Sequence, residues 1–235
     1  VSLVLVLSGL IGIALGDTCY FESLARIGVR RSLMIGLLAP VFTAVVAAIA
    51  GQPLPGIIGF AGISLTLGGI LLVVRVAPVR EDVGEAPVTR HRGIGAWGFG
   101  VMAALCQAIG IVMTKDAIGR SGMLPASLLR LVAGGLGILA FELLRGRGAG
   151  LPLALVRGFA RPRLVLATLL GTVVAFYLFQ VAVMLGSPPV TAALCATSPI
   201  LVAPIAARWL GERMPWTAAL GTFLAVGGVV LVALD

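Results

Sequence analysis

The sequence predicts an all-α membrane protein, a polytopic helix bundle of about eight transmembrane helices. Of its 235 residues, 60% are hydrophobic and only 11% are charged, and its mean hydropathy is +1.14. A soluble domain needs a more polar surface than this composition can supply. A spanning helix needs about 20 mostly apolar residues to cross roughly 30 Å of hydrocarbon, so the chain has room for about eight crossings.

Eight apolar segments are long enough to span, and turn or charge signals separate them. They lie near residues 2–25, 32–50, 54–74, 94–114, 124–144, 164–185, 189–208 and 215–234. Only the stretches 75–92 and 145–163 are long enough to be linkers. The first of these is polar and predicts a hinge between two halves.

The positive charge of the chain is gathered in one set of loops. The net charge is +8, which in a soluble protein would raise the question of nucleic acid, but here the arginines lie between apolar segments. Fourteen of the 17 Lys and Arg residues fall on one side of the eight-helix topology, and Lys115, Arg120 and Arg130 fall on the other. The positive-inside rule then places the two linkers in the cytoplasm and Asp235 outside. This distribution predicts contact with a lipid bilayer and no nucleic-acid partner.

The sequence contains an internal repeat in which residues 16–74 align with 174–233. The matched residues include Glu22 with Gln180, Pro40 with Pro199, and Gly68-Gly69 with Gly227-Gly228. A proline inside an apolar helix frees backbone carbonyls, which are tolerated in lipid only inside protein or along a cavity. Matched bends at Pro40 and Pro199 therefore favour a central binding site, although they could instead set packing angles only.

The two copies of the repeat resemble the EamA-type repeat of the drug/metabolite transporter superfamily. The first copy is carried by the run Gly16 to Ser32 and by Ala39-Pro40-Val41-Phe42, and the second by Ser198-Pro199-Ile200-Leu201, Gly211-Glu212-Arg213 and Gly227-Gly228. The resemblance covers almost the entire chain. It implies two inverted five-helix repeats, of which this chain matches three helices of the first and five of the second.

The resemblance divides the chain into an incomplete first repeat at 1–75, a cytoplasmic linker at 76–92 and a second repeat at 93–235. The first two helices of the first repeat are expected to be missing, as in a fragment or a chain with a misplaced start. The chain departs from the family at Gly51-Gln52, where Gly-Glu is frequent. Its basic loops also imply termini outside the cytoplasm.

Three ionisable residues within the apolar segments are candidates for function, because a charge at the centre of a membrane helix costs about 2.5–3.5 kcal/mol. Asp17 has no basic residue one turn away, which favours a role in proton coupling or in binding an ammonium group; a hydrogen-bonded packing role is the alternative. Glu22 precedes Arg26 by four residues, so that pair can neutralise itself. Arg130 could hold a carboxylate or phosphate, or extend to the outer interface.

Weaker polar signals complete the predicted substrate or proton pathway. They are Tyr20, Gln107, Tyr177, Gln180 and Ser198. Such side chains either line a polar path or join helices by hydrogen bonds. The three cysteines lie in apolar segments without metal-ligand spacing, and His91 is the sole histidine, so neither a metal nor another cofactor is predicted.

The resemblance implies a secondary-active transporter, more often an exporter, of a small metabolite such as an amino acid or nucleoside, with a proton as a candidate co-substrate. Alternating access between the two repeats is the expected mechanism. The sequence has no Walker motif and no metalloprotease motif, and an enzyme is not expected. A lipid flippase or a non-transporting structural subunit is the alternative. The expected location is the bacterial inner membrane as a multi-pass protein, and a homodimer is left open.

Overall fold

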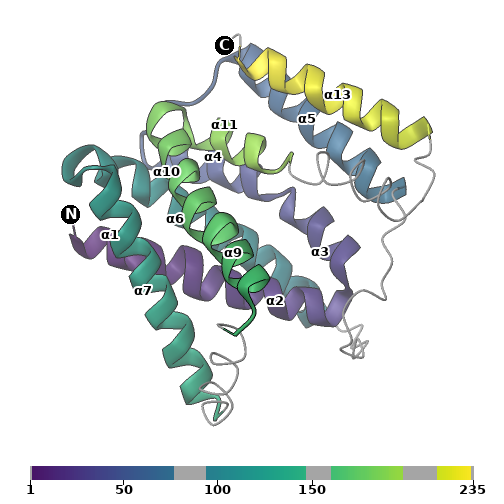
Figure 1. Ribbon diagram of the computed structural model, residues 1–235. Coiled ribbons are helices and arrows are strands. Elements are labelled where there is room, and N and C mark those ends of the chain that lie inside the picture. Colours follow the sequence, from purple (N-terminus) through teal and green to yellow (C-terminus); the bar gives the residue numbers. More distant parts are fainter. Residues whose placement is uncertain (1, 77–93, 147–159, 198–215, 234–235) are drawn as a thin grey trace.

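A computed structural model describes residues 2–76, 94–146, 160–197 and 216–233, and almost all of these residues are helical (Figure 1). The first half contains α1 (Ser2–Gly9), the π-helix η1 (Leu10–Leu15), α2 (Gly16–Ile27), α3 (Val29–Gly36), α4 (Ala39–Ile49) and α5 (Ile57–Val76). The second half contains α6 (Ile94–Ser121), α7 (Met123–Leu144), α9 (Pro162–Thr168), the π-helix η3 (Leu169–Val174), α10 (Ala175–Leu185), α11 (Pro188–Cys195) and α13 (Trp216–Ala233). No strand occurs in these ranges, so the predicted all-α class is confirmed.

The helices follow the predicted apolar segments. In the described part of the chain, five continuous helical stretches are long and apolar enough to cross a membrane, namely 2–27, 31–49, 97–121, 123–144 and 162–185. Shorter apolar helices cover 57–73 and 219–231. The predicted segment 189–208 is described only as far as Thr197.

Two helix boundaries differ from the prediction. Helix α5 begins at Ile57 rather than near residue 54, because Pro53 and Pro55 disfavour helix just before it. Helix α6 continues through the charged stretch after Lys115 to Ser121, where a loop was expected. It ends at Gly122, whose φ of 82° is a conformation that glycine adopts readily.

The second span is interrupted just before Pro40. Helix α3 ends at Gly36, and α4 begins at Ala39 with Pro40 in its first turn. Between them, the Leu38 N–H donates to the Ile35 carbonyl oxygen over 2.9 Å, which is the tighter pattern of a 3₁₀ turn. Pro40 is buried, and the matched Pro199 lies outside the described residues.

The first span, α1–η1–α2, packs between α6 and α7 through small residues. A Cβ atom added to Gly12 would lie 3.2 Å from Gly110 Cα of α6, and one added to Gly134 of α7 would lie 2.6 Å from Ile13 Cβ. Close backbone approach at glycine is typical of membrane helix interfaces. Gly134 thus lies in the contact between the two helices, whereas nothing lies within 4 Å of a Cβ atom at the adjacent Gly135.

Helices α5 and α13 lie side by side at one edge of the bundle (Figure 1), and their contact is reciprocal. Gly69 approaches Gly221 and Ala225, while Gly228 approaches Gly62 and Thr66. The repeat alignment that matches Gly69 with Gly228 also matches Gly62 with Gly221, so each contact has its counterpart. This is the pattern of a local two-fold relation between antiparallel helices.

The two π-helical turns occupy nearly equivalent places in the repeat. The shift that matches Glu22 with Gln180 carries η1 onto residues 168–173, one residue from η3 at Leu169–Val174. A π-turn contains one extra residue relative to an α-helix and is frequent at functional sites. The side chains beside η1 and η3 are therefore candidates for a functional site.

Candidate functional site

A buried polar pair joins α7 to α10 in the interior of the bundle. Arg130 Nη1 donates a hydrogen bond of 2.6 Å to Gln180 Oε1. The Arg130 residue is only 3% exposed and Gln180 is 0% exposed. The structure thus brings together two residues that the sequence marks separately, one on the fifth predicted segment and one on the sixth.

The guanidinium of Arg130 is bordered by an aromatic ring and a glycine. Its Cζ atom lies 5.3 Å from the centre of the Phe176 ring, within the range of a cation–π contact. On another side, a Cβ atom at Gly12 would lie 3.5 Å from Arg130 Nη2. Gly12 belongs to η1, and Phe176 follows the end of η3 by two residues, so both π-turns lie next to the pair.

The Arg130–Gln180 pair retains unused hydrogen-bond donors. Both Arg130 Nε and Gln180 Nε2 are buried and have no hydrogen-bond partner in the described part of the chain. No ion pair joins Arg130 to a carboxylate of the described residues. Buried polar groups normally find partners, so these donors mark a site that a solute could complete.

Along the length of the helices, the Arg130–Gln180 pair lies closer to one end of the bundle than to its middle. Arg130 follows the start of α7 at Met123 by seven residues, or about 10 Å of helix at 1.5 Å per residue. Gln180 precedes the end of α10 at Leu185 by five residues. Under the predicted topology both positions fall in the outer third of their spans.

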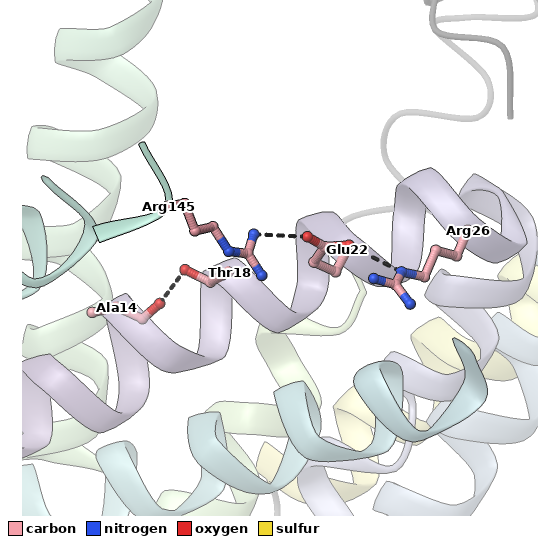
Figure 2. Close-up of polar contacts among 5 residues, drawn as sticks. All are labelled: Ala14, Thr18, Glu22, Arg26 and Arg145. Carbon is pink, nitrogen blue, oxygen red and sulfur yellow. Dashed lines mark hydrogen bonds and ion pairs between the residues drawn. The ribbon is translucent and has the colours of Figure 1, made fainter. Parts of the chain in front are cut away.

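At the other end of α7, an ion-pair cluster joins the first span to the start of the 145–163 loop (Figure 2). Glu22 Oε1 accepts a 2.8 Å contact from Arg145 Nη1, and Glu22 Oε2 accepts a 3.0 Å contact from Arg26 Nε. The predicted Glu22–Arg26 pair is therefore confirmed. Arg145 is an additional partner that sequence spacing could not reveal, because it lies 123 residues away.

Asp17 and Tyr20 are half-buried on α2, five and two residues before Glu22. Asp17 forms no ion pair with any described residue. The adjacent Thr18 hydroxyl donates to the Ala14 carbonyl oxygen over 2.6 Å (Figure 2). Asp17 and Tyr20 thus remain candidates for the proton pathway, separate from the Arg130–Gln180 pair.

Of the remaining predicted pathway residues, the two that the structure describes are exposed and not buried beside Arg130. Gln107 is exposed on α6, and Tyr177 is 39% exposed on α10. Tyr177 lies three residues before Gln180, which turns it about 60° away from the buried face of the helix. Ser198 lies outside the described residues.

Several polar contacts lie outside the predicted pathway. Thr114 Oγ1 lies 3.4 Å from Ser8 Oγ, between α6 and α1. Gln52 Nε2 donates to the Val112 carbonyl oxygen over 3.0 Å, and Lys115 Nζ donates to the main chain at Met184 over 2.8 Å. These contacts join neighbouring elements, and single polar residues in a sequence do not show which partner they will meet.

Phe176 was missed by the sequence reasoning. It precedes Gln180 by four residues, so the two side chains share a helix face. An aromatic residue one turn from a membrane glutamine is a signal that could have identified it.

A cavity of about 460 Å³ lies between α1, α4 and α6. Its walls are mostly aliphatic, with Val4, Val46 and Val112 among them, and Arg120 is the charged residue that reaches it. Neither Arg130 nor Gln180 contributes to its lining. An apolar cavity of this kind offers volume but little specificity, in contrast to the polar pair.

Comparisons with known proteins agree with this architecture. The sequence profile of the EamA-like transporter family matches residues 2–75 and 95–234. Ten chains of solved structures match, among them a crystal structure titled only "Crystal structure of protein". It superposes with a TM-score of 0.66 at 16% sequence identity, over 99% of this chain and 86% of that chain; at this identity the likeness concerns the fold alone. A search of curated proteins found no match.

Proposed function

Because the chain belongs to the EamA-like transporter family, we propose that it is a secondary-active transporter that carries a small metabolite across a lipid bilayer. Members of this family are membrane transporters. Amino acids and nucleosides are the proposed cargo, export is the proposed direction, and the bacterial inner membrane is the proposed location.

The observation that carries this proposal is the Arg130–Gln180 pair. A bundle that served structure alone would gain little from a buried guanidinium without an ionic partner in the described residues, because taking such a charge out of water is costly. A solute that binds and leaves can use those free donors in each transport cycle. The unfavourable free energy of burying Arg130 is then part of how the site works.

Alternating access between two related halves is the proposed mechanism. The reciprocal contact of Gly69 and Gly228, and the equivalent places of η1 and η3, support a two-fold relation between the halves. Under the predicted topology, the Arg130–Gln180 pair lies toward the outer face and the Glu22–Arg145 ion pair toward the cytoplasmic face. Making and breaking the Glu22–Arg145 pair would close and open the cytoplasmic side.

Reconstitution into liposomes tests the proposal. Purified protein is incorporated into vesicles loaded with radiolabelled amino acids or nucleosides, and efflux is compared with that from protein-free vesicles. We expect at least one solute class to leave faster with the protein, and more slowly with the Gln180→Leu variant. The Leu178→Ala variant, altered two residues away at an exposed position of the same helix, should behave like the unaltered chain.

The same vesicles distinguish the alternatives. Movement of a fluorescent phospholipid between leaflets without solute efflux would replace the proposal by lipid flipping, which the aliphatic cavity of α1, α4 and α6 could serve. If neither solute nor lipid moves faster than in protein-free vesicles, the transporter proposal is wrong and a structural role remains.

A further inference from the structure

The donors left free beside Gln180 define what kind of chemical group could complete the site. Arg130 has one hydrogen bond to a described side chain, the one from Nη1 to Gln180 Oε1, and its buried Nε has none. Gln180 turns its carbonyl oxygen to Arg130, and its Nε2 is buried without a partner. Both free groups are donors, so the missing partner must accept hydrogen bonds.

The charge around the site is also incomplete. Gln180 is neutral, and the carboxylate of Glu22 is engaged by Arg26 and Arg145. Asp17 lies on the same span as Gly12 but five residues farther along, beyond one helical turn, and forms no ion pair with Arg130. One negative charge supplied from outside the chain would neutralise the buried guanidinium.

A glycine and an aromatic ring border the guanidinium of Arg130. A Cβ atom at Gly12 would lie 3.5 Å from Arg130 Nη2 and 3.2 Å from Gly110 Cα. Any larger side chain at Gly12 would approach Nη2. The ring of Phe176 lies within cation–π distance of the guanidinium.

From these donors and this charge we infer that the Arg130–Gln180 pair binds the carboxylate group of the transported solute. A carboxylate has two coplanar oxygens that match the fork of a guanidinium, and its single negative charge balances Arg130. A phosphate dianion would leave one negative charge in excess at a buried site. This inference deepens the proposed transport function and rests on it.

Matched pairs of solutes test the inference. Binding is measured by the shift in melting temperature of the purified protein in detergent, and transport by efflux from vesicles. Each pair shares a skeleton and differs in one group, as in leucine and leucinamide or phenylacetate and phenylacetamide, and inorganic phosphate serves as a separate probe. We expect the carboxylates to bind roughly 10- to 100-fold more tightly than their amides, as loss of a charge-assisted hydrogen bond would predict.

Three variants link that preference to the pair. Arg130→Gln should abolish the difference between acid and amide, and Arg130→Lys should retain part of it, since lysine keeps the charge without the fork. Gln180→Glu places a carboxylate within the chain beside Arg130, so it should raise the melting temperature and abolish carboxylate binding. Arg163→Gln, an exposed change on α9, is the control and should leave the preference unaltered.

The results separate the inference from the proposed function. Equal binding of acids and amides with solute efflux intact would overturn the carboxylate site and leave the transporter proposal standing. Tighter binding of inorganic phosphate, or carboxylate binding of ordinary strength in the Gln180→Glu variant, would also overturn it. If no solute binds or moves in the unaltered chain, the proposed function is wrong, and the inference falls with it.

Discussion

Arg130 of α7 and Gln180 of α10 meet in the bundle interior through a hydrogen bond of 2.6 Å. The repeat alignment matches Gln180 with Glu22, and Glu22 also receives an arginine from the end of α7, Arg145, over 2.8 Å. Two equivalent positions of the repeat therefore bind arginines at opposite ends of one helix. Arg145 meets a full negative charge and Arg130 meets a neutral amide, so only the first contact is an ion pair.

Unfolding measurements on single and double variants would quantify the Arg130–Gln180 contact. Gln180→Leu should destabilise the protein by about 1–3 kcal/mol, because it leaves a buried guanidinium without that acceptor. Arg130→Met combined with Gln180→Leu should recover part of that loss, since neither polar group then remains. Equilibrium unfolding in mixed micelles gives the free energies. Strictly additive effects would show that the two side chains do not interact.

The glycines between α5 and α13 should tolerate no side chain on the contact face. A Cβ atom at Gly69 would meet main-chain atoms of Gly221 and Ala225, and one at Gly228 would meet Thr66. We expect Gly69→Ala and Gly228→Ala each to cost about 1–3 kcal/mol, as overpacking does. Gly68→Ala is the matched control, because nothing lies within 4 Å of that position. Equal stability of Gly68→Ala and Gly69→Ala in thermal unfolding would contradict the packing.

The spans were predictable from sequence for a physical reason that applies to each of them. A membrane helix must satisfy its own backbone and present about 20 apolar residues to lipid, so α7 was predicted within one residue of its observed limits at Met123 and Leu144. The end of α6 was not, because the charges from Lys115 to Arg120 suggested a loop. A helix accepts charges in its last turns, and Gly122 rather than charge ends it.

The site was predictable only in part. Arg130 was marked by the cost of a charge in an apolar segment, and Gln180 by its place in the repeat. Their pairing depends on how α7 and α10 pack, 50 residues apart in the chain, which no spacing rule contains. The π-turns η1 and η3 were not expected either, because the sequences LIGIAL and LLGTVV fit an ordinary α-helix equally well.

The Glu22–Arg145 contact should matter little for stability and more for the transport cycle. Glu22 and Arg145 are 20% and 33% exposed at their side chains, and ion pairs of that exposure contribute about 0–1 kcal/mol. Arg145→Gln should therefore lower the melting temperature slightly, with a difference that shrinks as salt rises from about 0.05 M to 0.5 M. Efflux from vesicles should change more, because α2 and α7 lose a link at the ends that the arginine distribution predicts to be cytoplasmic. Unaltered efflux would exclude this contact from the cycle.

The orientation predicted from arginine counts can be tested by cysteine labelling. In a background with Cys19, Cys106 and Cys195 replaced by alanine, Arg120→Cys and Arg163→Cys each supply one exposed thiol near an opposite end of a span. A membrane-impermeant maleimide added to intact cells should label the Arg120→Cys protein, and should label the Arg163→Cys protein only after the cells are broken. The reverse pattern would invert the topology.

Asp17 provides the sharpest test of proton coupling. It is half-buried on α2 and forms no ion pair with a described residue, so its charge can change without breaking a salt bridge. Asparagine preserves its size but cannot take up a proton. We therefore expect Asp17→Asn to abolish uptake driven by a pH gradient, while exchange of labelled for unlabelled solute at equal pH continues, because exchange requires no net proton movement. Glu142→Gln, which alters a carboxylate on α7, is the control and should retain coupling. Gradient-driven uptake of normal rate and pH dependence in Asp17→Asn would remove Asp17 from the mechanism, whereas parallel loss of uptake, exchange and protein yield would assign it to helix packing.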